Sequence, residues 1–199
     1  MAVTAQQVQE LRRKSGAGVM DCKRALEECG GDVEQAATLL RKQGMARADA
    51  RLSRATTEGV VASYIHAGGK IGVLVELSCE TDFVARTDEF QELSRNLAMH
   101  IAAEQPRYVQ PDEIPADVLE EEKEVYRALA LKDGKPENVL GRIVEGRLKK
   151  FYSEVCLLEQ PYVRDDQKTV GELLSESRAR LGENIAVRRF VRYQLGEGG

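Results

Sequence analysis

The fold is decided by residues 60–77, VVASYIHAGGKIGVLVEL, in which two apolar runs flank a Gly-Gly pair. In the second run Ile71, Val73, Val75 and Leu77 alternate with other residues, a pattern typical of a strand with one buried face. A glycine pair between β-branched runs is a hairpin signal. This stretch therefore predicts two strands joined by a tight turn.

Downstream of the hairpin the apolar spacing becomes helical. Thr87 is expected to cap a helix whose buried stripe comprises Phe90, Leu93, Leu97 and Ile101. Two more helices are expected to take Pro115 and Pro136 at their first positions, and Thr169 with Glu172 forms a capping box for a fourth. Residues 185–195 alternate as a final strand. Strands and helices are segregated along the chain, so the predicted fold class is α+β.

Upstream of the hairpin, residues 1–44 indicate three short helices. Thr4 with Gln7 fits a capping box, Gly16 to Gly18 interrupts the pattern, Asp32 caps the third helix, and Gly44 is the predicted end of that helix. Three short amphipathic helices are expected to pack as one small bundle. The predicted domains are therefore a three-helix bundle over 1–44, a solvated linker over 45–57 and an α+β core over 58–199.

Composition narrows the function classes. The 199 residues carry a formal net charge of -4, with 42% hydrophobic and 31% charged residues, so we expect a soluble folded chain and no nucleic-acid partner. None of the four cysteines forms a C-x-x-C pair, and free thiols in a reducing cytoplasm are the expected state. The sequence has no signal peptide and no apolar run of about 20 residues, so no membrane association is expected.

The residue patterns of enzymes are missing from the sequence. His66 and His100 are far apart and lack metal-ligand spacing, and neither a phosphate-binding glycine loop nor a G-x-S-x-G elbow occurs. We therefore expect no enzymatic activity, no cofactor, no metal site and no direct nucleotide binding.

Residues 76–86, ELSCETDFVAR, carry the most specific signal. Asp82 and Phe83 lie side by side where the second hairpin strand leads into the next helix. On local grounds two interpretations are open. Asp82 is a helix cap and Phe83 a core side chain, or both residues act on a partner.

Two stretches resemble the elongation factor Ts family of bacteria, the nucleotide exchange factors of elongation factor Tu. They are residues 11–26, LRRKSGAGVMDCKRAL, and residues 81–86, TDFVAR. The resemblance extends over nearly the whole chain, although Ser78 stands where the family commonly has Asn.

The resemblance implies a mechanism. An N-terminal bundle like a ubiquitin-associated domain docks on the partner, with Arg12 and Lys23 as candidate contacts. The turn after the hairpin then disturbs the partner's Mg²⁺ and phosphate site. It implies that Phe83 is the apolar wedge and Asp82 the polar perturbing group, while Thr81 and Val84 hold the turn.

The resemblance also bears on self-association. Longer members carry a second core subdomain and a helical hairpin insertion, and the length of this chain leaves no room for both. A homodimer is therefore expected, in which a second copy supplies the missing surface. The final strand offers a contact, with Val187, Val191 and Tyr193 expected on one face. A monomer, whose last strand only completes its own sheet, remains the alternative.

Two further interpretations compete with exchange activity. One is an adaptor with a ubiquitin-associated-like bundle, which does not require the residue 81–86 turn. The other is an RNA-binding protein that uses Arg188, Arg189 and Arg192. A solvated sheet edge is the favoured interpretation of these arginines, because no interleaved aromatic platform accompanies them.

Overall fold

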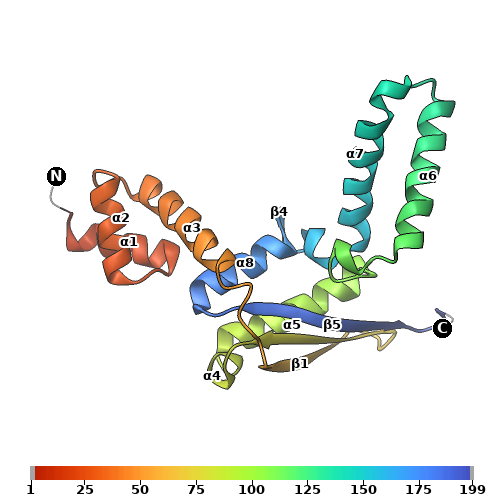
Figure 1. The fold of residues 1–199 in the computed structure, drawn as a ribbon. Helices are drawn as coiled ribbons and strands as arrows, with labels where there is room; N and C mark the ends of the chain where they lie inside the picture. Colours follow the sequence, from red (N-terminus) through yellow and green to blue (C-terminus); the bar gives the residue numbers. More distant parts are fainter. Residues whose placement is uncertain (1–2, 198–199) are drawn as a thin grey trace. The chain divides into compact units, whose positions relative to one another are not determined.

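The computed structural model describes residues 3–197, apart from the side chains of Met45 and Asp49. The hairpin forms as predicted, and the strand order in the three-stranded sheet of the described residues is β1-β2-β5. The fold is α+β, as predicted (Figure 1). Along the chain the elements are α1 (Ala5–Ser15), α2 (Val19–Glu28), α3 (Val33–Asp49), β1 (Glu58–Ile65), β2 (Ile71–Cys79), α4 (Asp82–Ala85), α5 (Asp88–Glu104), η1 (Pro111–Glu113), α6 (Ala116–Lys132), α7 (Glu137–Val155), η2 (Leu157–Glu159), β3 (Pro161–Tyr162), β4 (Asp165–Thr169), α8 (Val170–Leu181) and β5 (Ile185–Gln194).

The chain divides into two compact units. The first unit comprises Met1–Gly59, Cys79–Val84 and Leu174–Ala186. The second unit comprises Val60–Ser78, Ala85–Leu173 and Val187–Gly199. The first unit thus combines the N-terminal helices with two short segments that are distant in sequence. The domain boundaries predicted at residues 44 and 57 remain a prediction.

The three-helix bundle of the first unit forms with the predicted caps. Thr4 and Gln7 make the capping box of α1, and the Asp32 carboxylate accepts hydrogen bonds from the first backbone N–H groups of α3. The buried core of this bundle consists of Leu11, Cys22, Ala25, Leu26, Ala36 and Leu40. These residues recur at helical spacing, so each helix contributes one apolar stripe to a shared core.

The predicted end of the third helix at Gly44 is wrong, because α3 continues to Asp49. The residues after Gly44 include alanines and an arginine, which favour helix, and Ala48 is buried. A Cβ atom at position 44 would lie 3.2 Å from the Cβ of Ala179 on α8. The glycine therefore permits close approach of these two helices and does not end the first of them.

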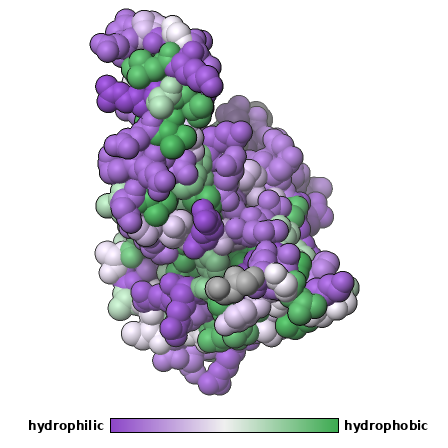
Figure 2. Space-filling model, turned by 90° about the vertical axis from the view of Figure 1, so that its right-hand side faces the viewer, coloured by the Kyte–Doolittle hydropathy of each residue, from purple (hydrophilic) through white to green (hydrophobic). Residues whose placement is uncertain are grey.

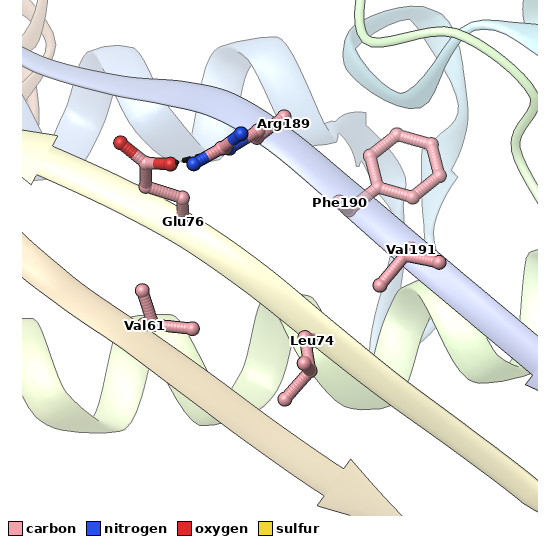
Figure 3. Close-up of a pocket in the computed structure, with 6 residues that line it drawn as sticks. All are labelled: Val61, Leu74, Glu76, Arg189, Phe190 and Val191. Carbon is pink, nitrogen blue, oxygen red and sulfur yellow. Dashed lines mark hydrogen bonds and ion pairs between the residues drawn. The ribbon is translucent and has the colours of Figure 1, made fainter.

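In the second unit, α5 lies behind one face of the sheet (Figures 1 and 3). Thr87 caps α5 as predicted, and its hydroxyl accepts a hydrogen bond from the backbone N–H of Phe90. The predicted stripe of α5 is buried, as are Val73, Val75 and Leu77 of β2. The capping box of Thr169 and Glu172 at α8 is confirmed as well.

Helices α6 and α7 form a long hairpin that stands away from the sheet (Figure 1). Pro115 and Pro136 are the N-cap residues of these helices, one position before the predicted one. A buried cluster of Ile114, Phe151, Val155 and Cys156 fixes the base of the hairpin. Figure 2 shows apolar side chains among polar ones along this helical hairpin. The small antiparallel pair β3–β4 was not predicted from the sequence.

A buried hydrogen-bond network surrounds His100 of α5, which is 0% exposed. The Gln160 side-chain amide donates to the backbone oxygens of Glu104 and Glu154, so its oxygen faces Nε2 of His100 at 3.0 Å. Nε2 therefore donates, and Nδ1 accepts the N–H of Val163 at 3.2 Å. Burial lowers the pKa of His100 from 6.5, which keeps the ring neutral.

Candidate partner-binding site

The predicted exchange motif forms the Thr81–Val84 turn after β2, in which Thr81 precedes the single-turn helix α4 and the other three residues begin that helix. Phe83 is 80% exposed, whereas the adjacent Val84 is only 6% exposed. Thr81 and Asp82 are exposed too. Phe83 is therefore not a core side chain, and the interpretation that placed it in the core is wrong. A large exposed aromatic beside a buried anchor is a typical arrangement for contact with a partner.

Hydrogen bonds hold the backbone on both sides of Asp82 and Phe83. The Thr81 hydroxyl accepts the N–H of Val84 at 3.3 Å, and the Thr81 carbonyl accepts the thiol of Cys79 at 3.1 Å. Thr81 also contacts Glu183, 102 residues further along the chain, through its hydroxyl and its N–H. Glu183 was not predicted from the sequence, and no local pattern points to it because its partner is so distant along the chain.

The bundle carries the two candidate docking residues on its surface. Arg12 of α1 and Lys23 of α2 are both exposed, and Nζ of Lys23 lies 3.8 Å from the carboxylate of Glu27. The structure adds Val19 and Met20, which are 51% and 68% exposed at the start of α2. Met20 lies two positions before buried Cys22, and so on the opposite side of the helix, a spacing that was available in the sequence.

The bundle also contains a short ion pair between its first and third helices. Nζ of Lys14 donates a hydrogen bond to the Glu34 carboxylate, and this bond raises the pKa of Lys14 above 10.5. The pair is exposed, so its contribution to stability is small. Arg12, on the same helix, remains a candidate cation for a partner.

The three arginines of the RNA-binding interpretation make contacts within the chain. Nε of Arg188 donates to the hydroxyl of Ser78 at 3.2 Å, and Nε of Arg189 lies 2.7 Å from the carboxylate of Glu76. Arg192 donates to the backbone of Ala102 and pairs with a nearby carboxylate. These contacts favour the interpretation of the arginines as part of the sheet surface.

All four cysteines are free thiols, as predicted. Cys22, Cys79 and Cys156 are buried and Cys29 is half-buried. Burial raises the pKa of Cys156 to about 11, so this thiol stays protonated at neutral pH. Within residues 3–197 no cluster of three or more His, Cys, Asp and Glu side chains is arranged to hold a metal ion.

Comparisons with known proteins assign the family. The model of the family described as elongation factor TS matches residues 30–197. The chain belongs to the elongation factor Ts family. It is 59% identical over 198 residues to the elongation factor Ts of Geobacter sulfurreducens, an alignment that covers 100% of this chain and 92% of the relative.

Other relatives agree with this assignment. The chain is 57% identical to the elongation factor Ts of Carboxydothermus hydrogenoformans, with 98% of this chain and 90% of the relative covered. It is 56% identical to that of Caldanaerobacter subterraneus, with 98% of each chain covered. Membership in this family assigns the chain to the elongation step of protein synthesis. None of the helices over residues 3–197 is both long and apolar enough to cross a membrane.

Proposed function

We propose that this chain is a guanine-nucleotide exchange factor that binds the GDP form of elongation factor Tu in the cytoplasm and promotes GDP release. The observation that carries the proposal is Phe83, a large aromatic left 80% exposed within a motif of the elongation factor Ts family. An exposed aromatic held by an ordered turn gains apolar burial only when a partner covers it.

The proposed mechanism is competition between two binding events. The bundle docks on the GTP-binding domain of the partner, and Phe83 with Asp82 presses on the region that holds Mg²⁺ and the phosphates. Because Mg²⁺ neutralises phosphate charge, its displacement weakens the hold on GDP. An acceleration of about 10³–10⁴ corresponds to roughly 4–5.5 kcal/mol of barrier. The chain itself catalyses no covalent reaction and needs no cofactor, since the work is done by coupled binding.

Thermodynamic linkage provides a test. If the chain weakens GDP binding to elongation factor Tu by a given factor, GDP must weaken binding of the chain by the same factor. Titration calorimetry of the chain into nucleotide-free and GDP-bound elongation factor Tu measures this factor. We expect tighter binding to the nucleotide-free partner. Equal affinity for the two forms would show an adaptor without exchange activity.

We further propose that the chain forms a homodimer through the outer sheet face, which we define as Val61, Leu74, Val191 and Tyr193. These four side chains are between 37% and 70% exposed. Figure 3 shows Val61, Leu74 and Val191 beside one another in a hollow that is bordered by Glu76 and Arg189. The ion pair between these two residues neutralises charge at the border, which favours apolar contact with a second copy of the same face.

The structure leaves out one of the three final-strand residues that were predicted at the dimer contact. Val187 is buried, so only Val191 and Tyr193 of the three predicted residues are available on the surface. Light scattering at several concentrations tests the dimer. We expect about twice the 22.1 kDa of one chain, and a mass near 22.1 kDa for Val61→Lys. A wild-type mass near 22.1 kDa at every concentration would contradict the proposal.

A further inference from the structure

Two loops of the first unit bind one another through their carboxylates. Oε2 of Glu183, in the loop before β5, accepts the backbone N–H of Glu80 at 3.1 Å and that of Thr81 at 3.0 Å. In return, Oε1 of Glu80 accepts the backbone N–H of Asn184 at 2.6 Å. Each loop therefore supplies a carboxylate acceptor for backbone N–H groups of the other.

The second oxygen of Glu183 acts on the turn through a hydroxyl. Oε1 of Glu183 accepts the Thr81 hydroxyl proton at 2.7 Å. A threonine hydroxyl has one proton, so this bond leaves only its lone pairs for other partners. One lone pair accepts the N–H of Val84 at 3.3 Å. Glu183 thus sets the orientation of the hydroxyl that caps α4.

Asn184 connects a third segment to the same point. Its side-chain amide donates to the backbone oxygens of Leu52 and Arg54, at 3.2 and 2.8 Å. The residues that follow the bundle are therefore fastened to the loop that holds Thr81. All of these contacts lie within the first unit.

The helix that carries Phe83 needs such support. Helix α4 has four residues, far below the length at which a helix is stable by itself. The Phe83 side chain is mostly in solvent, so its own packing contributes little to its orientation. The direction of the aromatic ring is instead set by the flanking backbone, which Thr81 and buried Val84 hold.

We propose that Glu183 is a positioning residue, which orients the Thr81–Val84 turn so that Phe83 enters the partner in a productive geometry. This inference rests on the proposed exchange function. A loose turn would still reach the partner, but the ordering that Glu183 provides in the free chain would then have to occur during binding. Glu183 acts through Phe83 and does not itself touch the nucleotide site.

The first test measures the rate at which elongation factor Tu releases labelled GDP as the concentration of the Glu183→Ala variant is increased. Misplacement of a reacting group by about 1 Å lowers rates by about 10²-fold, so we expect a maximal release rate lower by about 10- to 100-fold. The half-saturating concentration should change less, because the bundle surface is intact. Glu183→Gln keeps one acceptor for the two N–H groups and should give an intermediate rate. Glu124→Ala, an exposed carboxylate of α6, is the matched control and should behave as wild type.

A double-mutant cycle separates positioning from a general loss of structure. In a Phe83→Ala background, Glu183→Ala should have little further effect on release, because the group through which it acts is gone. Equal losses in both backgrounds, or a wild-type rate for Glu183→Ala, would overturn the inference. If wild type does not accelerate release at all, the exchange function fails and this inference fails with it.

Amide hydrogen exchange in the free chain tests the contact itself, without the partner. The N–H groups of Glu80 and Thr81 should exchange slowly in wild type and faster in Glu183→Ala. The N–H of Phe90, which is capped by Thr87, should be unchanged in both and serves as the reference. Unaltered protection of Glu80 and Thr81 in the variant would overturn the inference as well.

Discussion

Phe83→Ala removes the proposed wedge while leaving the core in place. An aromatic side chain buries about 150–250 Å². Phe83 is 80% exposed, which leaves roughly 120–200 Å² for a partner to cover. At about 25 cal/mol per Å², this area corresponds to roughly 3–5 kcal/mol. Ordering of the side chain offsets about 1 kcal/mol, so the expected loss is about 2–4 kcal/mol, or roughly 30- to 1,000-fold.

The assay is stopped-flow release of labelled GDP from elongation factor Tu with increasing amounts of the variant. Because the wedge acts on the barrier to release, the loss should fall on the maximal rate more than on the half-saturating concentration. Phe83→Leu keeps part of the apolar area and should lie between alanine and wild type.

Fold stability provides the control. Removal of an exposed side chain changes the free energy of unfolding by about 0.5 kcal/mol or less. Phe90, seven residues later, is 0% exposed, and Phe90→Ala should cost about 3–5 kcal/mol. An unchanged release rate for Phe83→Ala would contradict its role as a wedge, and so would a loss of stability similar to that of Phe90→Ala.

Three further predictions follow from charge and burial. Replacing Arg12 and Lys23 together by alanine should raise the half-saturating concentration, most clearly at low salt, with little change in maximal rate; release at two ionic strengths measures this. The pKa of His100 is lower in the folded chain than in the unfolded chain, so as the pH falls the unfolded chain takes up a proton at this residue before the folded chain does. The free energy of unfolding that neutral His100 contributes is therefore complete above pH 6.5 and declines as the pH falls below it. Thermal melts at several pH values measure this decline, which should be weaker in His100→Gln. Alkylation of the native chain should modify Cys29 first and buried Cys156 last, since the pKa of the Cys156 thiol is about 11; peptide mass spectrometry would detect any other order.

Local signals allowed much of the fold to be predicted. The Gly-Gly hairpin, the Thr87 cap and the capping box at Thr169 each depend on residues within a few positions of one another, and each is confirmed. The end of α3 was missed because Gly44 serves a contact with a helix about 135 residues later, and only the fold brings these helices together. Strands β3 and β4 were missed because they are too short to show the alternation of apolar residues that marks a strand in a sequence.

The candidate site was predictable only in part. The residues of the Thr81–Val84 turn were found from the family resemblance, and the exposure of Phe83 could not be derived from its local pattern. A strand end followed by a polar and an aromatic residue fits a buried staple as well as an exposed contact. Glu183 was beyond reach because its contacts with Glu80 and Thr81 span more than 100 residues.

The proposed exchange function is tested by the rate of GDP release from elongation factor Tu at increasing concentrations of this chain. Labelled GDP is preloaded on elongation factor Tu and an excess of unlabelled GDP is added with the chain. We expect a rate that rises and then saturates, about 10³–10⁴ times above the spontaneous rate. A release rate that stays at the spontaneous value at every concentration, with the chain folded and bound to elongation factor Tu, would contradict it.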